Sequence, residues 1–230
     1  MKKNTSAAKP SANKRTQASQ SKANAASQSK ASTAVSKSTT STFKLNSSEQ
    51  NKNESLLEKF FMDQLKDIYY AENKIVKSLP VLENACTTDE LKEAFSDHRH
   101  QTQKHIQRLE KVFKLLNQKP EAKKCEAIEG IVKECESIID ETEKGSMTRD
   151  AALVMAAQKV EHYEIATYGG LVQFAITMGK KDIAELLDKT LMEEEETDHL
   201  LTKIAEWHIN IEAEEEEKYS WNRQKAEKKS

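Results

Sequence analysis

The sequence has few residues that interrupt secondary structure, and this scarcity limits the possible folds. Only 5 Gly and 3 Pro occur among 230 residues, whereas a protein built from sheets needs frequent turns. No apolar run reaches the length of about 18 residues that a membrane-spanning helix requires, so we expect no membrane contact. The N-terminus also lacks the apolar segment of a secretory signal peptide. These absences favour an all-helical protein that is not secreted.

Cysteine is equally scarce, and its spacing excludes two common uses. Cys86, Cys125 and Cys135 are odd in number and form no Cys-x-x-Cys pair. This pattern is typical neither of a disulfide framework nor of a zinc site. We therefore predict reduced thiols in a cytoplasmic protein, with Cys125 buried rather than reactive.

Acidic residues are almost missing from the first 53 positions, which hold ten Lys and Arg but one Glu, a net charge of +9. The rest of the chain has 36 − 10 = 26 basic and 38 − 1 = 37 acidic residues, a net charge of −11. Residues 1–53 are rich in Ser, Ala and Lys and have little to bury, so we predict a disordered tail. A helical domain is expected over 54–212 and a charged C-terminal tail over 213–230.

The helical domain has apolar residues spaced three and four apart, the period of amphipathic helices. This period predicts long helices over about 55–80, 88–116 and 148–179, with a fourth after Gly179. Pro80 is expected to end the first helix and Thr88 to cap the second. About 30 residues, 117–146, separate the two pairs and contain a short amphipathic helix. Two helical hairpins joined by one long crossover are typical of a ferritin-like four-helix bundle.

Ionisable residues interrupt the apolar face of every long helix. If the hairpins turn near residues 85 and 180, these residues lie at similar heights within each hairpin. Unpaired carboxylates would be costly in one core, whereas carboxylates with an imidazole suit two iron or manganese ions. We therefore predict a site for two divalent metal ions, with these ligands: Glu72, His98, Glu161, Glu164, Glu194 and Asp198.

For neighbouring residues we prefer simpler interpretations. Glu195 and Glu196 are expected in solvent, and His162 beside the site or at the surface. His105 is interpreted as a histidine of the core or rim rather than as a ligand. The tyrosines are interpreted as packing residues, although a tyrosine near two iron ions can be redox-active.

Several segments resemble the YciE/YciF family of bacterial ferritin-like proteins over roughly residues 55–213. They are "KVEHYEIATYG", "RDAALVMAAQKVEHYE", "KKCEAIEGI" and "DIYYAENKIVKSLP". The resemblance implies a cytoplasmic homo-oligomer, expected to be a dimer, with a role in stress response and metal ligands at the six positions above. Many members carry acidic residues on helix two where this chain has His100 and Gln101 in "HRHQT". Helix two is then expected to contribute His98, with Gln101 one turn further on.

Three functions remain open from the sequence. The first is oxidation chemistry at a pair of iron or manganese ions, of the peroxide-detoxifying or ferroxidase kind. The second is non-specific DNA binding through basic residues of the tail. The alternative for the tail is that it only keeps the protein soluble. The third is a structural scaffold that holds no metal. The candidate DNA contacts are Lys2, Lys3, Lys9, Lys14, Arg15 and Lys22.

Overall fold

The computed structural model describes residues 54–216, and within them the chain is helical without strands. Its α-helices are α1 (Leu56–Ala85), α2 (Asp89–Leu115), α3 (Glu126–Glu141), α4 (Met147–Thr177) and α5 (Lys181–Ile204). A π-helical turn, η1 (Ala205–Ile209), continues α5, and α-helix resumes to residue 216. None of the described helices combines the length and the apolar character needed to cross a membrane.

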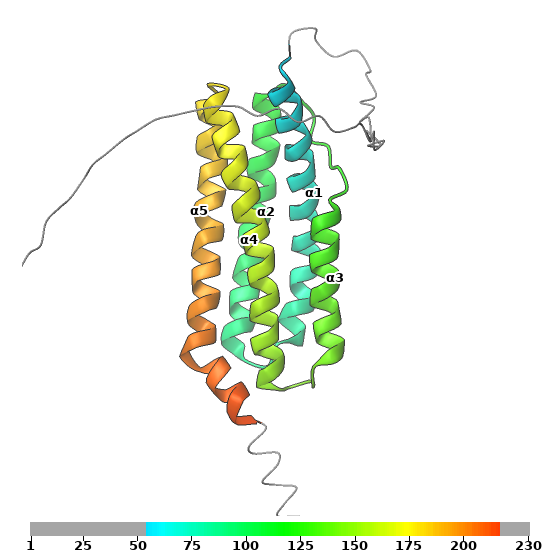
Figure 1. Cartoon of the computed structure of the whole chain (residues 1–230), viewed down its shortest axis with the longest axis vertical. Helices are drawn as coiled ribbons and strands as arrows, with labels where there is room; N and C mark the ends of the chain where they lie inside the picture. Colours follow the sequence, from blue (N-terminus) through cyan, green and yellow to red (C-terminus); the bar gives the residue numbers. More distant parts are fainter. Residues whose placement is uncertain (1–53, 217–230) are drawn as a thin grey trace, which may run out of the picture. The chain divides into compact units, whose positions relative to one another are not determined.

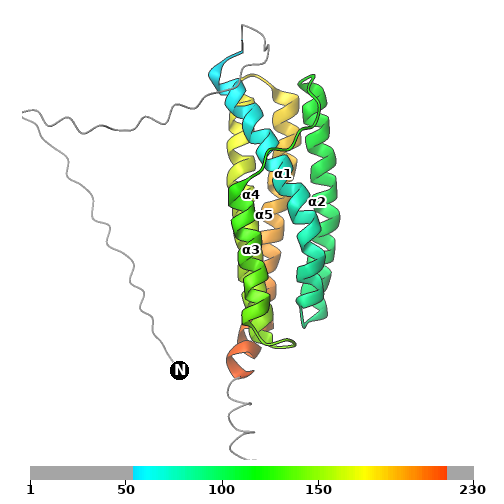
Figure 2. The same ribbon diagram turned by 90° about the vertical axis from the view of Figure 1, so that its right-hand side faces the viewer.

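The four long helices form two hairpins, as the sequence predicts. Helix α1 packs against α2, and α4 packs against α5, while α2 also contacts α5 and α1 contacts α4 (Figure 1). The crossover runs between the hairpins, and its helix α3 lies against α4 and α1 (Figure 2). This arrangement is the predicted ferritin-like bundle with one crossover.

The prediction that Pro80 ends the first helix is wrong, because α1 continues to Ala85 with Pro80 inside it. A proline in a helix lacks the N–H that would bond to the preceding turn. The last turn is nevertheless held by burial of Leu79 and Leu82, which flank the proline. The Asn84 side-chain amide also donates to the Pro80 carbonyl at 2.6 Å. The connection to α2 therefore falls at residues 86–88 rather than near residue 85.

The start of α2 is capped from the other hairpin rather than by its own first residue. Thr88 occupies the predicted N-cap position, but its side chain accepts no bond from α2. The buried carboxylate of Asp150 on α4 accepts from the Thr87 amide at 2.7 Å and the Thr88 amide at 2.8 Å. It also accepts from the Thr88 hydroxyl at 2.8 Å. Asp150 thus fixes the position of α2 relative to α4.

The C-terminal end of the described chain caps α4. Helix continues four residues beyond the predicted boundary at 212. The Glu216 carboxylate accepts from the Met147 amide at 2.8 Å and from the Thr148 amide at 3.0 Å. Negative charge at a helix N-terminus is favourable, so residues 213–216 belong with the bundle. The remaining C-terminal residues and the whole basic segment 1–53 lie outside the described residues.

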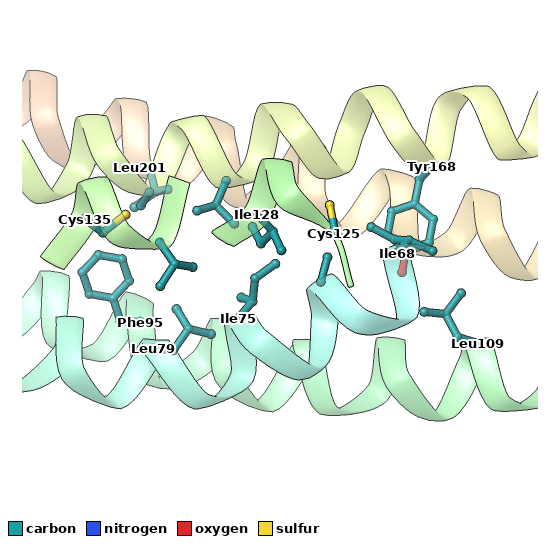
Figure 3. Packing of buried hydrophobic residues seen from close by; sticks show 14 of the residues in the cluster. Ile68, Ile75, Leu79, Phe95, Leu109, Cys125, Ile128, Cys135, Tyr168 and Leu201 are labelled. Atoms are coloured by element: carbon teal, nitrogen blue, oxygen red, sulfur yellow. The ribbon is translucent and has the colours of Figure 1, made fainter. Parts of the chain in front are cut away.

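The bundle interior is apolar at both ends and polar in the middle. Aliphatic and aromatic side chains such as Phe61, Leu65, Leu91 and Leu187 are buried, and part of this packing is shown in Figure 3. The three cysteines are free, as predicted, and all three are buried, which the sequence analysis predicted for Cys125. The polar middle layer contains the candidate site.

Candidate metal centre

Six buried side chains from the four long helices form two overlapping groups. In each group, one nitrogen or oxygen of every residue lies within 4.8 Å of those of the others. Ligand atoms bound to one ion at about 2.1 Å are at most about 4.2 Å apart, so this spacing is close to that of a metal site. The first group is His98, Glu161, Glu164 and Glu194, and the second is Glu72, His105 and Glu194.

Unpaired polar atoms are concentrated in these two groups. Nine buried side-chain nitrogen or oxygen atoms of the described residues have no hydrogen-bond partner. Eight of the nine belong to the six residues of the two groups, and the other is Nε of Arg99. Buried polar atoms are normally paired, and each exception requires a physical explanation. Bound metal ions would supply partners for seven of the eight, because the imidazole of His98 binds an ion through only one of its two nitrogens.

The closest contacts within the groups also lack hydrogen-bond geometry. His105 Nδ1 lies 2.9 Å from Glu194 Oε1 and 3.6 Å from Glu72 Oε1, yet Nδ1 has no hydrogen-bond partner. His98 Nε2 lies 3.4 Å from Glu161 Oε1, and neither nitrogen of this ring is hydrogen-bonded. These contacts are ion pairs when the histidine is charged, and the spacing of their atoms also suits ligands of a common metal ion.

The orientation of His105 is set by a chain of charged groups behind it. Its Nε2 lies 2.9 Å from Glu193 Oε2, and because a carboxylate only accepts, Nε2 carries the proton of this bond. Arg108 donates to both Glu193 oxygens, at 3.0 and 3.1 Å, and to the Thr190 hydroxyl at 2.5 Å. With Nε2 engaged in this way, Nδ1 faces the second group. Such a carboxylate behind a histidine is the usual support of a metal-binding imidazole.

Glu72 has a similar support from α4. The ring of Tyr168 is fully buried, and its hydroxyl donates a short hydrogen bond to Glu72 Oε1. The other oxygen, Oε2, has no partner and remains available. Tyr168 therefore packs in the core, as predicted from the sequence, and also holds one of the candidate ligands.

In the metal-free protein, burial and the charges of neighbouring residues shift the pKa values of the candidate ligands. Burial, followed by the charge of Glu194, raises the pKa of Glu161 and of Glu164 well above the usual glutamate value. Burial lowers the pKa of His98. Burial also opposes protonation of His105, but its contacts with Glu194 and Glu72 outweigh that effect and raise its pKa to about 10. The metal-free centre therefore holds protons that a metal would displace.

Five of the six residues predicted as ligands lie in the two groups, and Asp198 does not. Its half-buried carboxylate accepts from Gln158 Nε2 at 3.1 Å and lies 3.3 Å from Nε2 of the exposed His162. Gln101, expected to assist His98, accepts from the Thr197 hydroxyl at 3.2 Å, and its side chain also interacts with the His98 ring in the direction that raises the pKa of His98. Glu195 and Glu196 are exposed, as expected. Metal binding by the six predicted residues stays a prediction.

Sequence reasoning missed His105, which it assigned to the core or rim. The signal was present, because His98 and His105 are seven residues apart and two helical turns bring them to the same face. A turn near residue 85, as assumed in the sequence analysis, sets Glu72 level with His98 and therefore leaves His105 without an apparent partner. With the connection centred on Thr87, Glu72 is level with Thr102, between the two histidines, and so reaches the second of them.

The complete donor set is four carboxylates and two imidazoles. Carboxylate-bridged di-metal bundles use the same total, with one Glu-x-x-His motif on each of two helices. Here α2 supplies both histidines and α4 both members of a Glu-x-x-Glu pair, while α1 and α5 supply one glutamate each. Fold and site together define a ferritin-like bundle with a buried carboxylate and imidazole centre that can hold metal.

The chain belongs to a family described as a domain of unknown function, DUF892, which matches residues 56–214. It is 42% identical over 159 residues to protein YciF of Escherichia coli K12, covering 69% of this chain and 95% of that protein. The crystal structure of the E. coli stress protein YciF is similar with a TM-score of 0.65 and 40% identity, covering 68% of this chain and 99% of the other. The structure of YcfI from Rhodopseudomonas palustris has a TM-score of 0.63 and 39% identity, covering 67% and 98%. The resemblance noted in the sequence is thus confirmed.

Proposed function

We propose that the buried centre binds two divalent ions, iron or manganese, and that with iron it oxidises Fe(II) at the expense of dioxygen or hydrogen peroxide. The observation that supports this most strongly is the confinement of eight unpaired buried atoms to six residues of carboxylate and imidazole type. No protein group among the described residues pairs with these atoms, so a scaffold without metal would need protonated carboxylates and bound water to offset the cost of burying them.

The charge of the centre also fits two divalent ions. The four carboxylates of Glu72, Glu161, Glu164 and Glu194 carry four negative charges when ionised, and two divalent ions balance them. Glu194 belongs to both groups, so its carboxylate would contact both ions when they are bound. Carboxylate and imidazole ligands are suited to iron and manganese, whereas thiolate ligands favour zinc and copper.

Bound Fe(II) would supply the electrons: two ions and two protons reduce one O2 to H2O2, or one H2O2 to two H2O, leaving two Fe(III). The protein residues would hold the ions, orient the ligand side chains and exclude water from the centre. Glu193 and Arg108 fix the ring of His105, Tyr168 fixes Glu72, and the apolar layers on both sides keep the centre dry. The E. coli relative is described as a stress protein, and removal of Fe(II) and oxidant is a function consistent with stress.

Metal content tests this proposal directly. Elemental analysis by ICP-MS after anaerobic loading with Fe(II) is expected to find about two ions per chain, as in other di-metal carboxylate bundles. Glu194→Gln is expected to lose both ions because its carboxylate is shared between the groups. Asp198→Asn is expected to retain them if Asp198 is only a neighbour of the site. Glu195→Gln, at an exposed position next to Glu194, is the matched control.

Two results would contradict the proposal. Protein that stays metal-free after anaerobic loading would leave the scaffold as the better explanation. Equal metal loss in Glu194→Gln and Glu195→Gln would show binding to the acidic surface of α5 rather than to the core. Oxidation is then followed in loaded protein, as Fe(III) absorbance after addition of O2 or of H2O2.

A further inference from the structure

A small apolar pocket adjoins the first metal-binding group. Its volume is about 20 Å³, and residues of α1, α2, α3 and α4 line it, with His98 and Glu161 in its wall. The other lining residues are mainly aliphatic or sulfur-containing, among them Leu79, Val132, Cys135 and Ala157. Figure 3 shows Leu79 of α1 and Cys135 of α3 at this end of the core. The pocket therefore joins a hydrophobic wall to two candidate ligands.

The lining favours an apolar occupant over water or peroxide. A buried water needs two to four polar partners, whereas almost all of the surface that the lining exposes to the pocket belongs to apolar atoms. The Ser78 hydroxyl already donates to the Lys74 carbonyl at 3.1 Å. The other polar members of the lining are His98 and Glu161, whose unpaired atoms belong to the metal group, and the rest of the lining is apolar or sulfur-containing. Hydrogen peroxide would lose its hydrogen bonds to water on entering, whereas dioxygen has none to lose.

The cysteine in the wall does not provide a peroxide reaction of its own. Thiolate, not thiol, is the reactive nucleophile, and burial raises the pKa of Cys135 to about 11. Its sulfur points to the backbone carbonyl of Ala156 at 3.9 Å. Cys135 therefore acts as a neutral, polarizable part of an apolar wall.

We propose that this pocket is a binding chamber for dioxygen, which delivers O2 to the His98 and Glu161 side of the centre. The inference rests on the proposed function, and it selects O2 rather than H2O2 as the oxidant of Fe(II). It also assigns a role to α3, because the crossover helix supplies Val132 and Cys135 to the wall of the chamber.

Xenon binding tests the chamber without any metal. Xenon enters dry apolar cavities, so crystals of the metal-free protein under xenon pressure are expected to show xenon among Leu79, Cys135 and Ala157. The variant Ala157→Val adds two methyl groups at the wall and is expected to exclude xenon. Ala152→Val, on the same helix but outside the lining, is the matched control. If Ala157→Val fails to fold, Val132→Ile fills the chamber from α3.

Oxidation kinetics then test the occupant. In iron-loaded protein, Ala157→Val is expected to slow oxidation by O2 several-fold while oxidation by H2O2 and the amount of bound iron stay unchanged. Absence of xenon from the wild-type pocket would overturn the inference, and so would an equal effect of the variant on both oxidants. A protein that binds xenon but neither binds nor oxidises iron would instead refute the proposed function, and the assignment of dioxygen with it.

Discussion

The ionisation of Glu164 gives the sharpest test of the buried centre. Burial, with the charges of Glu194, Glu72 and Glu161, raises its pKa well above the usual glutamate value. A group with a raised folded-state pKa contributes stability that is complete below its unfolded pKa and is lost as pH rises toward the folded pKa. Metal-free protein should therefore lose stability through this group as pH rises above about 4.5. Glu164→Gln imitates the protonated carboxyl and removes that loss.

The magnitude follows from proton linkage. While the carboxyl stays protonated in the folded state and ionises on unfolding, the free energy of unfolding falls by about 1.4 kcal/mol per pH unit. Relative to wild type, Glu164→Gln should thus gain stability as pH rises above about 4.5, with a slope of at most about 1.4 kcal/mol per pH unit. His98 and His105 also titrate with shifted pKa values. Taking the difference between variant and wild type removes most of their contributions.

The assay is urea unfolding of chelator-treated protein across this pH range, followed by circular dichroism. Glu195→Gln is the control, because its side chain is exposed and its substitution should change stability by less than about 0.5 kcal/mol at every pH. Metal-loaded wild type should show the opposite trend, since metal displaces protons and binds more tightly at higher pH. A difference between Glu164→Gln and wild type that does not change with pH would refute the reasoning.

Two further predictions concern the support of His105 and the N-terminal segment. Arg108→Ala should lower the free energy of unfolding by about 2 kcal/mol, because it leaves Glu193 without its charged partner, and should weaken metal binding about tenfold or more by releasing the His105 ring. Urea unfolding and metal titration measure the two effects, with Lys104→Ala at an exposed position as the control. Unchanged metal affinity in Arg108→Ala would contradict the prediction. If Lys2, Lys3 and the other basic residues of 1–53 contact DNA, the full chain should retard duplex DNA in a gel with an affinity that falls steeply with salt. A chain lacking 1–53 should not do so, and equal retardation by both chains would refute the role of the tail.

The helices and the direction of their polar residues were predictable because both depend on local periodicity. Glu161 and Glu164 are good helix formers that would be harmless in solvent, yet their place in an apolar stripe correctly indicated that they point inward, where both are buried. The crossover helix was predictable for the same reason. The limits of local signals show at Pro80, where burial of Leu79 and Leu82 extends a helix that the proline alone would end.

Membership of the site was decided by tertiary structure. The sequence placed His105 and Asp198 on buried or partly buried faces, but only the register between helices shows which face reaches the centre. When the connection is centred on Thr87 rather than near residue 85, the position on α2 that lies at the height of Glu72 shifts by about one helical turn, toward His105. Asp198 follows Glu194 by one turn of α5, yet Gln158 and His162 engage it outside both groups. Periodicity fixes the face of a residue on its own helix, whereas its height and partners depend on turns and contacts far away in the sequence.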